Sequence, residues 1–216
     1  MAVMFRKCLR ASVSPAADGN KEFMKIGVLA LQGDFLEHKV ILQKLGVETI
    51  EVRLPKDLAG LSGLIIPGGE STTIGKLAVA FGLMEPLRHF AREFPVWGTC
   101  AGAIFLSQNA KKEQPLLKMM DITVERNAFG AQVDSFEADL DIDELKKATG
   151  TDDPFRAVFI RAPIIESVRG NARVLSRLAD GRIVAAIEGH LLATSFHPEL
   201  TKDTRFHQYF LSLCKK

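Results

Sequence analysis

The stretch that decides the fold is Pro95-Val96-Trp97-Gly98-Thr99-Cys100-Ala101-Gly102-Ala103-Ile104-Phe105-Leu106, in which a Gly-x-Cys-x-Gly turn joins two apolar runs. This succession of strand, tight turn and helix is the pattern of the nucleophile elbow in Gly-x-Ser-x-Gly hydrolases, with sulfur in place of oxygen. Glycines on both sides let the backbone turn sharply and let neighbouring elements approach closely. The sequence therefore predicts that Cys100 lies between the end of a buried strand and the start of a helix.

The predicted position of Cys100 suits nucleophilic catalysis. The dipole of the following helix favours the thiolate form of a cysteine at its N-terminus. The backbone amide of the next residue, Ala101, points to the place where an oxyanion forms during acyl transfer. We therefore predict a cysteine nucleophile that acts on an acyl group, with Ala101 as one oxyanion donor.

A candidate base for this nucleophile comes late in the chain, in Ser195-Phe196-His197-Pro198-Glu199, directly after the apolar run 191–194. Alternate residues of an extended segment point the same way, so the Glu199 carboxylate can reach the imidazole of His197. His197 would then move protons while Glu199 orients the ring and stabilises the imidazolium. By itself the segment is more simply an ordinary exit from a strand into a loop. Together with the elbow, it predicts a Cys–His–Glu triad.

Outward from the elbow, the first half of the chain alternates strands with helices. We expect strands at 26–31, 48–52, 63–66 and 95–99, and helices at 35–45, 71–81 and 84–94. This alternation predicts a parallel sheet covered on both faces. After Met119 we expect strands at 122–126, 133–138, 158–161 and 191–196, a hairpin of 174–176 with 183–187, and a closing helix at 202–213. We expect Glu144–Ala148 to be a short charged helix or a loop. The predicted fold is a single three-layer α/β domain with a mixed, centrally parallel sheet.

Composition narrows the function further. The chain has 216 residues, enough for one substantial core, with 47% hydrophobic and 25% charged residues. Residues 1–23 hold four basic and two acidic residues, which leaves 24 basic and 24 acidic residues in 24–216. Because this part of the chain is neutral and has no obvious basic face, the sequence does not predict nucleic-acid binding. No apolar run reaches the roughly 18 residues of a membrane span. Three cysteines are too few for a disulfide framework, so we expect a reducing, cytoplasmic setting.

Residues 1–23 differ from the rest, and we expect a disordered N-terminal extension ahead of a catalytic domain at 24–216. Residues 1–17 carry three basic residues and no acid, a composition found in organelle transit peptides. Organelle targeting is the less favoured reading, beside a start codon placed too far upstream or a remnant of cloning. Met24-Lys25-Ile26-Gly27 reads as a natural beginning.

A second glycine turn, Pro67-Gly68-Gly69-Glu70-Ser71, follows the strand expected at 63–66. Ligands of open parallel sheets bind beyond the carboxyl ends of the strands, where this turn and Cys100 both lie. Gly68 and Gly69 can offer backbone amides to an oxyanion, and Glu70 can hold the ammonium group of an amino acid. The alternatives are a plain turn and a helix N-terminus that Ser71 or Glu70 caps.

These motifs resemble those of the class I, triad-type glutamine amidotransferases. Within that family the chain is most similar to the branch of glutaminase subunits of pyridoxal 5′-phosphate synthase. The motifs that carry this closer resemblance are Leu31-Gln32-Gly33, Pro67 to Thr73, Val124 to Glu137, Phe159 to Pro163 and Ser195 to Thr201. The resemblance covers about residues 24–214.

The resemblance implies that Cys100 attacks the side-chain amide of L-glutamine and forms a γ-glutamyl thioester, with His197 and Glu199 completing the triad. It implies a glutamine site that is lined by Gly68, Gly69, Glu70, Arg126, Ile160 and Arg161. It places Gln32 near a separate synthase subunit, which would take up the ammonia within a large hetero-oligomeric complex. It implies no metal and no cofactor, because pyridoxal phosphate would be the product of the complex. An arginine fits this site physically, since its fork matches the substrate α-carboxylate.

Other functions remain open at this point. The same triad would serve a stand-alone γ-glutamyl hydrolase or a cysteine peptidase. A catalytically silent regulatory subunit is a second alternative, against which the complete triad argues, and a sensing protein with a reactive elbow cysteine is a third. We expect solvated or half-buried side chains for His38, His89 and His207, and packing of the terminal helix for Cys214.

Overall fold

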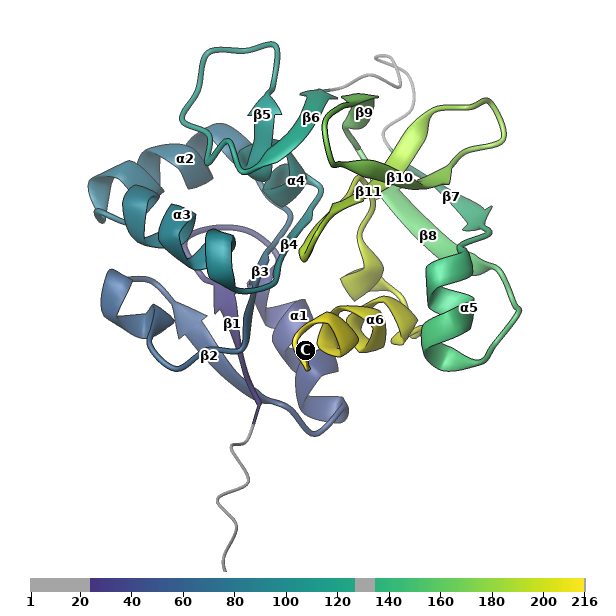
Figure 1. Ribbon diagram of the computed structural model, residues 1–216, viewed down its shortest axis with the longest axis horizontal. Helices are drawn as coiled ribbons and strands as arrows, with labels where there is room; N and C mark the ends of the chain where they lie inside the picture. The colour runs from purple at the N-terminus through teal and green to yellow at the C-terminus, as the bar shows by residue number, and fades with distance from the viewer. Residues whose placement is uncertain (1–23, 127–134, 216) are drawn as a thin grey trace, which may run out of the picture.

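The computed structural model describes residues 24–126 and 135–215. Within them, ten strands form one twisted sheet in the order β2-β1-β3-β4-β12-β11-β9-β6-β5, with β10 paired to β11 (Figure 1). The parallel half comprises β2 (Glu48–Val52), β1 (Lys25–Leu29), β3 (Gly63–Ile66), β4 (Val96–Thr99) and β12 (Leu191–Thr194). The rest comprises β11 (Ile183–Glu188), β9 (Ile164–Val168), β6 (Met120–Glu125), β5 (Ser107–Asn109) and β10 (Arg173–Arg177).

Helices cover both faces of this sheet, and a hairpin of β7 (Ser135–Leu140) and β8 (Phe155–Ile160) lies beside it. Figure 1 shows α2 and α3 on one side of the sheet and α1 and α6 on the other. The α-helices are α1 (Phe35–Lys44), α2 (Ser71–Ala80), α3 (Met84–Glu93), α4 (Ala101–Leu106), α5 (Asp143–Thr149) and α6 (Arg205–Leu213). Two 3₁₀ turns are η1 (Pro55–Leu58) and η2 (Pro198–Leu200).

The alternation of side chains along each central strand builds two separate cores. In β3, Leu64 and Ile66 pack into the core beneath α2, α3 and α4, whereas Ile65 packs into the core that also holds residues of α1 and α6. A strand whose two faces are both covered must be apolar at successive positions, which explains its continuous apolar sequence. The second core is rich in aromatic rings, among them Trp97 and Phe206, whose centroids lie 5.9 Å apart. The predicted layers are therefore confirmed.

The register of the parallel half decides where the site forms. β12 pairs in parallel with β4, which brings Thr194 opposite Thr99, and β3 pairs with the other edge of β4. β1 continues the same parallel run beside β3. The carboxyl ends of four neighbouring strands therefore open at one edge of the sheet, although the ends of β1 and β12, Leu29 and Thr194, are 165 positions apart in the sequence.

Several sequence expectations need correction. Strands β5 and β9 are not among the expected elements. Both are short, and no further turn residue separates β9 from the preceding Ala162-Pro163. Residues 144–148, expected as a short helix or a loop, are helical and lie within α5, which ends at Gly150 in a left-handed conformation. Ser71 does not cap α2, because the Glu70 carboxylate accepts the amides of Thr72 and Thr73.

The remaining sequence expectations concern segments outside the described residues and membrane-spanning helices. The expected N-terminal extension, residues 1–23, lies outside the described residues, as do the first two residues of the strand expected at 133–138. Among the residues that the structure describes, no helix has the length and apolar character needed to cross a membrane.

Candidate active site

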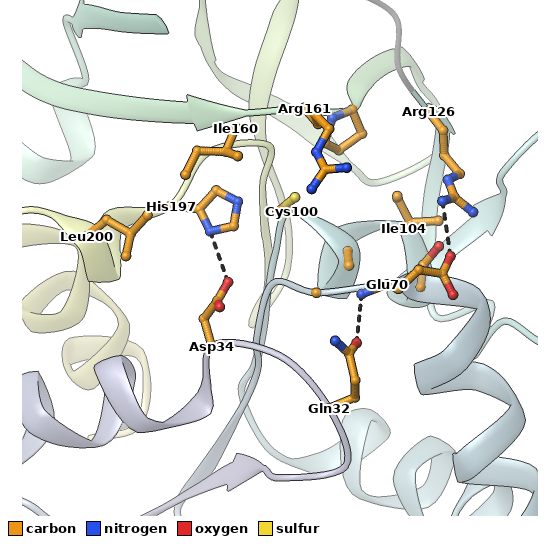
Figure 2. Close-up of a pocket in the computed structure, with 14 residues that line it drawn as sticks. Gln32, Asp34, Glu70, Cys100, Ile104, Arg126, Ile160, Arg161, His197 and Leu200 are labelled. Carbon is orange, nitrogen blue, oxygen red and sulfur yellow. Dashed lines mark hydrogen bonds and ion pairs between the residues drawn. The ribbon is translucent and has the colours of Figure 1, made fainter. Parts of the chain in front are cut away.

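The loops that follow β1, β3, β4 and β12 meet at the carboxyl edge of the sheet and surround a pocket of about 450 Å³. The pocket is lined by residues of each of these loops, including Gln32, Gly69, Cys100 and His197. Side chains near the end of β6, in the other half of the sheet, and near the end of β8, in the separate hairpin, also line the pocket, as Figure 2 shows for Arg126, Ile160 and Arg161. The structure thus brings most of the sequence-predicted site residues to one place.

Cys100 has the strained backbone of a nucleophile elbow. Its φ of 47° and ψ of −104° lie outside the regions that residues other than glycine normally adopt. A glycine is needed at position 102, because a Cβ there would lie 2.0 Å from the carbonyl oxygen of Ile66. The Cys100 amide donates to the carbonyl of Thr194, at 2.8 Å, which ties the elbow to β12. The strain is therefore held by the parallel sheet itself.

His197 lies beside Cys100, and its ring is fixed from behind by Glu199. The Nδ1 atom is 2.6 Å from Oε1 of Glu199, and both side chains are buried. The backbone amide of His197 donates to the carbonyl of Val158 in β8, at 2.8 Å. Burial of the ring disfavours its charge, but hydrogen bonds with the Cys100 sulfur and the Glu199 carboxylate outweigh burial and raise the pKa of His197 to about 10. Cys100, His197 and Glu199 therefore lie next to one another, with the ring of His197 in the middle.

The environment of Glu199 is unusual for a carboxylate. Its side chain is fully enclosed, and this burial raises the pKa of Glu199 although the hydrogen bond with His197 opposes the rise. A charge that is removed from water needs partners that stabilise it. The groups that surround Glu199 therefore matter for its ionisation.

Asp34 is a neighbour of the triad that sequence reasoning missed. Its Oδ2 lies 3.6 Å from Nδ1 of His197, and its side chain remains 41% exposed (Figure 2). Asp34, His197 and Glu199 bring possible ligand atoms within 4.8 Å of one another, but the imidazole and Glu199 are engaged with each other. The sequence feature that identifies Asp34 as a candidate site residue is its position directly after Gln32-Gly33, beyond the end of β1.

The glycine turn after β3 lies against both the triad and the loop after β1. Gly69 has a φ of 147°, and a Cβ there would lie 2.5 Å from Oε1 of Gln32. Gln32 accepts the amide of Glu70 at 2.7 Å, and the Gly68 carbonyl accepts the amide of Asp34 at 3.1 Å. Gly68 does not line the pocket, but a Cβ on it would lie 2.5 Å from Cε1 of His197. Gln32 therefore holds the turn in its present conformation.

Across the pocket from His197, Glu70 and Arg126 form an ion pair. An Arg126 nitrogen lies 3.0 Å from a carboxylate oxygen of Glu70, and Figure 2 draws the pair at the pocket wall. Partial burial opposes ionisation of Glu70, but hydrogen bonds from Thr73 and Thr72 outweigh it and lower the pKa of Glu70 to about 2. The pair offers one cation and one anion to a ligand, the charges that a free amino acid complements.

Ile160 and Arg161 complete the wall beside Cys100. Ile160 is 38% exposed at the end of β8, where its side chain lines the pocket. Arg161 has a φ of 43°, a conformation that a non-glycine residue rarely adopts. Strain of this kind persists where the surrounding structure imposes it, often at functional sites.

Two of the three histidine expectations are wrong. His38 and His207 are both completely buried, and Nδ1 of His38 lies 3.0 Å from Nε2 of His207. Sequence spacing gives no signal for this pair, because the two residues are 169 positions apart on different helices. His89 is exposed and faces Glu93 at 3.6 Å. Cys214 packs against the second core as expected, and burial raises the pKa of its thiol to about 12.

Comparison with known proteins gives a family match over most of the chain. Residues 28–216 match the model of the SNO glutamine amidotransferase family. The chain is 54% identical over 194 residues to a protein of Roseiflexus sp. (strain RS-1) and 57% identical over 195 residues to one of Herpetosiphon aurantiacus. Each match covers 88% of this chain and 100% of the relative, and both relatives are named pyridoxal 5′-phosphate synthase subunit PdxT.

Solved structures give the same result. A crystal structure of a glutamine amidotransferase is 49% identical with a TM-score of 0.81, and the match covers 88% of this chain and 99% of that one. At 16% identity and a TM-score of 0.66, the structure of PurLQS from Thermotoga maritima shares the fold, over 88% of this chain and 98% of that one.

Proposed function

This chain belongs to the SNO glutamine amidotransferase family, and from that premise we propose that Cys100, His197 and Glu199 are the triad with which it hydrolyses L-glutamine. The enzyme releases glutamate and ammonia, and the ammonia serves the synthesis of pyridoxal 5′-phosphate. The observation that carries the proposed triad is the contact chain from the Cys100 sulfur through the His197 ring to the buried Glu199 carboxylate.

The proposed reaction has two halves. The Cys100 thiolate attacks the side-chain carbonyl carbon of glutamine, and the charge that develops on its oxygen is met by backbone amides of Ala101 and the Gly68-Gly69 turn. The carbon–nitrogen bond then breaks as His197 gives its proton to the leaving amine, which departs as ammonia. Water attacks the resulting thioester and passes one proton to His197. The carbon–sulfur bond breaks, glutamate leaves, and the thiolate–imidazolium pair is restored.

The ion pair across the pocket supports glutamine as the substrate. In our proposal the α-carboxylate of glutamine binds Arg126 bidentately while the α-ammonium binds Glu70. The two side chains already face one another at 3.0 Å, so the substrate zwitterion would replace their contact with two of its own. Arg161 and Ile160 would line the same site beside the reacting amide.

The partner follows from the reaction. Ammonia released into water would be lost, so the glutaminase needs a synthase subunit to receive it, which agrees with the name that the two relatives carry. We propose a large hetero-oligomer of the two subunits, which acts in the cytoplasm without binding nucleic acid or membranes and without a cofactor on this chain.

We further propose that the partner gates the reaction through Gln32. Gln32 holds the amide of Glu70 and contacts Gly69, so a partner that moves Gln32 changes the conformation of the oxyanion turn. A glycine pair can change its peptide orientation at little steric cost. Low activity of the isolated chain would then protect the cell's glutamine.

A labelling experiment tests the proposed triad. The glutamine analogue 6-diazo-5-oxonorleucine should modify the full chain once, on Cys100, as intact mass and peptide mapping would show. Label spread over Cys8, Cys100 and Cys214 would reject a specially activated thiolate. A stand-alone γ-glutamyl hydrolase or peptidase is separated by comparing free glutamine with γ-glutamyl peptides, with and without the synthase subunit. Higher turnover of the peptides would favour that alternative.

A further inference from the structure

Behind the triad, two buried histidines continue the line of polar side chains into the core. Nε2 of His38 lies 3.3 Å from Oε2 of Glu199, and its Nδ1 lies 3.0 Å from Nε2 of His207. All three side chains are withdrawn from water. Two histidines buried in an aromatic core are costly, because imidazole nitrogens need partners. The cost suggests that the pair has a task.

The protonation of the pair can be worked out from its contacts. Burial, with the nearby His207 and His197, keeps the pKa of His38 well below its usual value, and burial lowers the pKa of His207 to about 3. Both rings are therefore neutral near pH 7, and each carries one N–H. Across the 3.0 Å contact, one ring must donate and the other must accept.

One of the two tautomer arrangements is clearly better. If His38 donated from Nδ1, its Nε2 lone pair would face the Glu199 carboxylate at 3.3 Å, and His207 would hold an N–H at Nδ1. In the part of the chain that the structure describes, Nδ1 of His207 has no hydrogen-bond partner. A buried N–H without an acceptor costs more than a buried lone pair without a donor. His207 therefore donates from Nε2, and His38 carries its proton at Nε2.

That proton faces two acceptors. Nε2 of His38 is 3.3 Å from the Thr99 hydroxyl oxygen, with hydrogen-bond geometry, and 3.3 Å from Oε2 of Glu199. Among residues 24–126 and 135–215, Oε2 of Glu199 has no hydrogen bond of its own, although it is buried. A modest rotation of the His38 ring would let the proton be shared between the hydroxyl and the carboxylate. His38 thus presents its N–H within 3.3 Å of the Glu199 oxygen that does not bond His197.

From this geometry we infer that His38, oriented by His207, is a positioning residue of the triad that acts through Glu199. His38 keeps Oε1 of Glu199 directed at His197 and supports the negative charge of the buried carboxylate. Trp97 holds the pair in place, since its ring centroid lies 5.7 Å from that of His38 and 5.1 Å from that of His207, both edge-on. The inference rests on the proposed triad and extends it by two residues.

The test compares His38→Leu with His38→Gln in the full chain, alone and in complex with the synthase subunit. Glutamine can donate to Glu199 from its amide nitrogen and accept from His207 with its oxygen, whereas leucine does neither. We expect His38→Leu to lower kcat for glutamine by about 10- to 100-fold with little change in KM, as when a residue that orients a functional histidine is lost. His38→Gln should recover most of that loss.

A second readout separates positioning from a merely structural effect. The rate at which iodoacetamide alkylates Cys100 should rise at higher pH in His38→Leu than in the wild type, because a weakened Glu199 stabilises the imidazolium less. His207→Gln, which keeps the donor to His38, should leave this pH profile close to that of the wild type. His89→Leu, at an exposed histidine, is the matched control, and thermal unfolding monitors the fold of every variant.

The outcomes are distinguishable. If His38→Leu is folded and has the kcat and the alkylation profile of the wild type, the inference is wrong even though the triad stands. Equal losses in the leucine and glutamine variants would also contradict it, because shape and not the donor would then matter. If Cys100→Ser keeps turning over glutamine, the proposed triad itself fails, whatever His38 does.

Discussion

The parallel half of the sheet, from β2 to β12, and the antiparallel half, β11-β9-β6 with the β7–β8 hairpin, serve the site in different ways. The parallel half holds Cys100 and His197 on buried backbone at the ends of adjacent strands. The antiparallel half brings Arg126, Ile160 and Arg161, which are more exposed and line the opposite wall. The residues proposed for bond making thus lie on buried backbone, whereas those proposed for recognition lie at more exposed strand ends.

The largest effect is expected from substitutions in the parallel half. Cys100→Ser or His197→Asn should lower glutamine turnover by at least about 10³-fold, because triad members act as a unit. Glu199→Gln should cost less, since the orienting member contributes less than the nucleophile or the base. Steady-state glutamate release from the complex measures all three. Near-normal turnover of His197→Asn would show that another group is the base.

The antiparallel half should affect substrate use without affecting the nucleophile. Arg126→Ala or Glu70→Ala removes a charged contact with the glutamine zwitterion, which costs roughly 2–5 kcal/mol. We expect kcat/KM for glutamine to fall tenfold or more while iodoacetamide still alkylates Cys100 at the wild-type rate. If both variants keep normal kinetics, the amino-acid site lies elsewhere in the pocket.

The proposed gating of the oxyanion turn by the synthase subunit can be tested at Gln32. We expect the synthase subunit to raise glutaminase activity at least about tenfold, which needs only about 1.4 kcal/mol of differential stabilisation of the competent turn. Gln32→Ala should lose much of that rise and keep its unfolding temperature. Glutamate release is compared for the isolated chain, the complex and the variant complex. Full activity of the isolated chain would contradict gating.

The buried histidines beneath the parallel half should make stability depend on pH. The pKa of His207 is lowered to about 3 from 6.5, so the unfolded chain binds more protons below pH 6.5. Its contribution is therefore present above pH 6.5 and is lost as the pH falls toward 3. The pKa of His197 is raised to about 10, so its contribution is complete below pH 6.5 and is lost as the pH rises through 10.

Urea unfolding at pH 4.5, 6.5 and 9 should therefore give the highest free energy of unfolding near pH 6.5. In His207→Phe the decline on the acid side should be shallower than in the wild type. If the free energy of unfolding of His207→Phe falls as steeply between pH 6.5 and pH 4.5 as that of the wild type, the decline comes from the carboxylates instead.

The smallest effect is expected at the surface of the hairpin. Arg156 in β8 contacts Glu137 at 2.8 Å and Asp139 at 3.1 Å, and all three side chains are more than half exposed. Ion pairs of this kind contribute little, because water and salt screen them. Arg156→Ala should shift the thermal unfolding midpoint by no more than about 1 °C. A larger drop, measured by circular dichroism, would show that the hairpin depends on its charges.

How far the sequence could be interpreted differs between the same two halves. Continuous apolar runs separated by helical segments predicted β1 to β4, and the elbow and His-Pro-Glu motifs predicted the triad residues. In the antiparallel half, short strands with mixed burial such as β5 and β9 gave no clear period. For α5 the sequence allows a helix or a loop, because seven residues with one buried side chain carry little periodic signal.

The sequence by itself determined which local elements form and which residues carry the chemistry, because turn glycines and apolar periodicity act over a few neighbouring residues. Only the tertiary structure decided that β12 lies beside β4, which brings His197 to Cys100 across 97 positions of sequence. It alone placed Asp34 beside His197 and stacked His38 and His207 behind Glu199. Such contacts depend on strand order and on the packing of distant helices, and these are fixed by burial of the whole core rather than by local sequence.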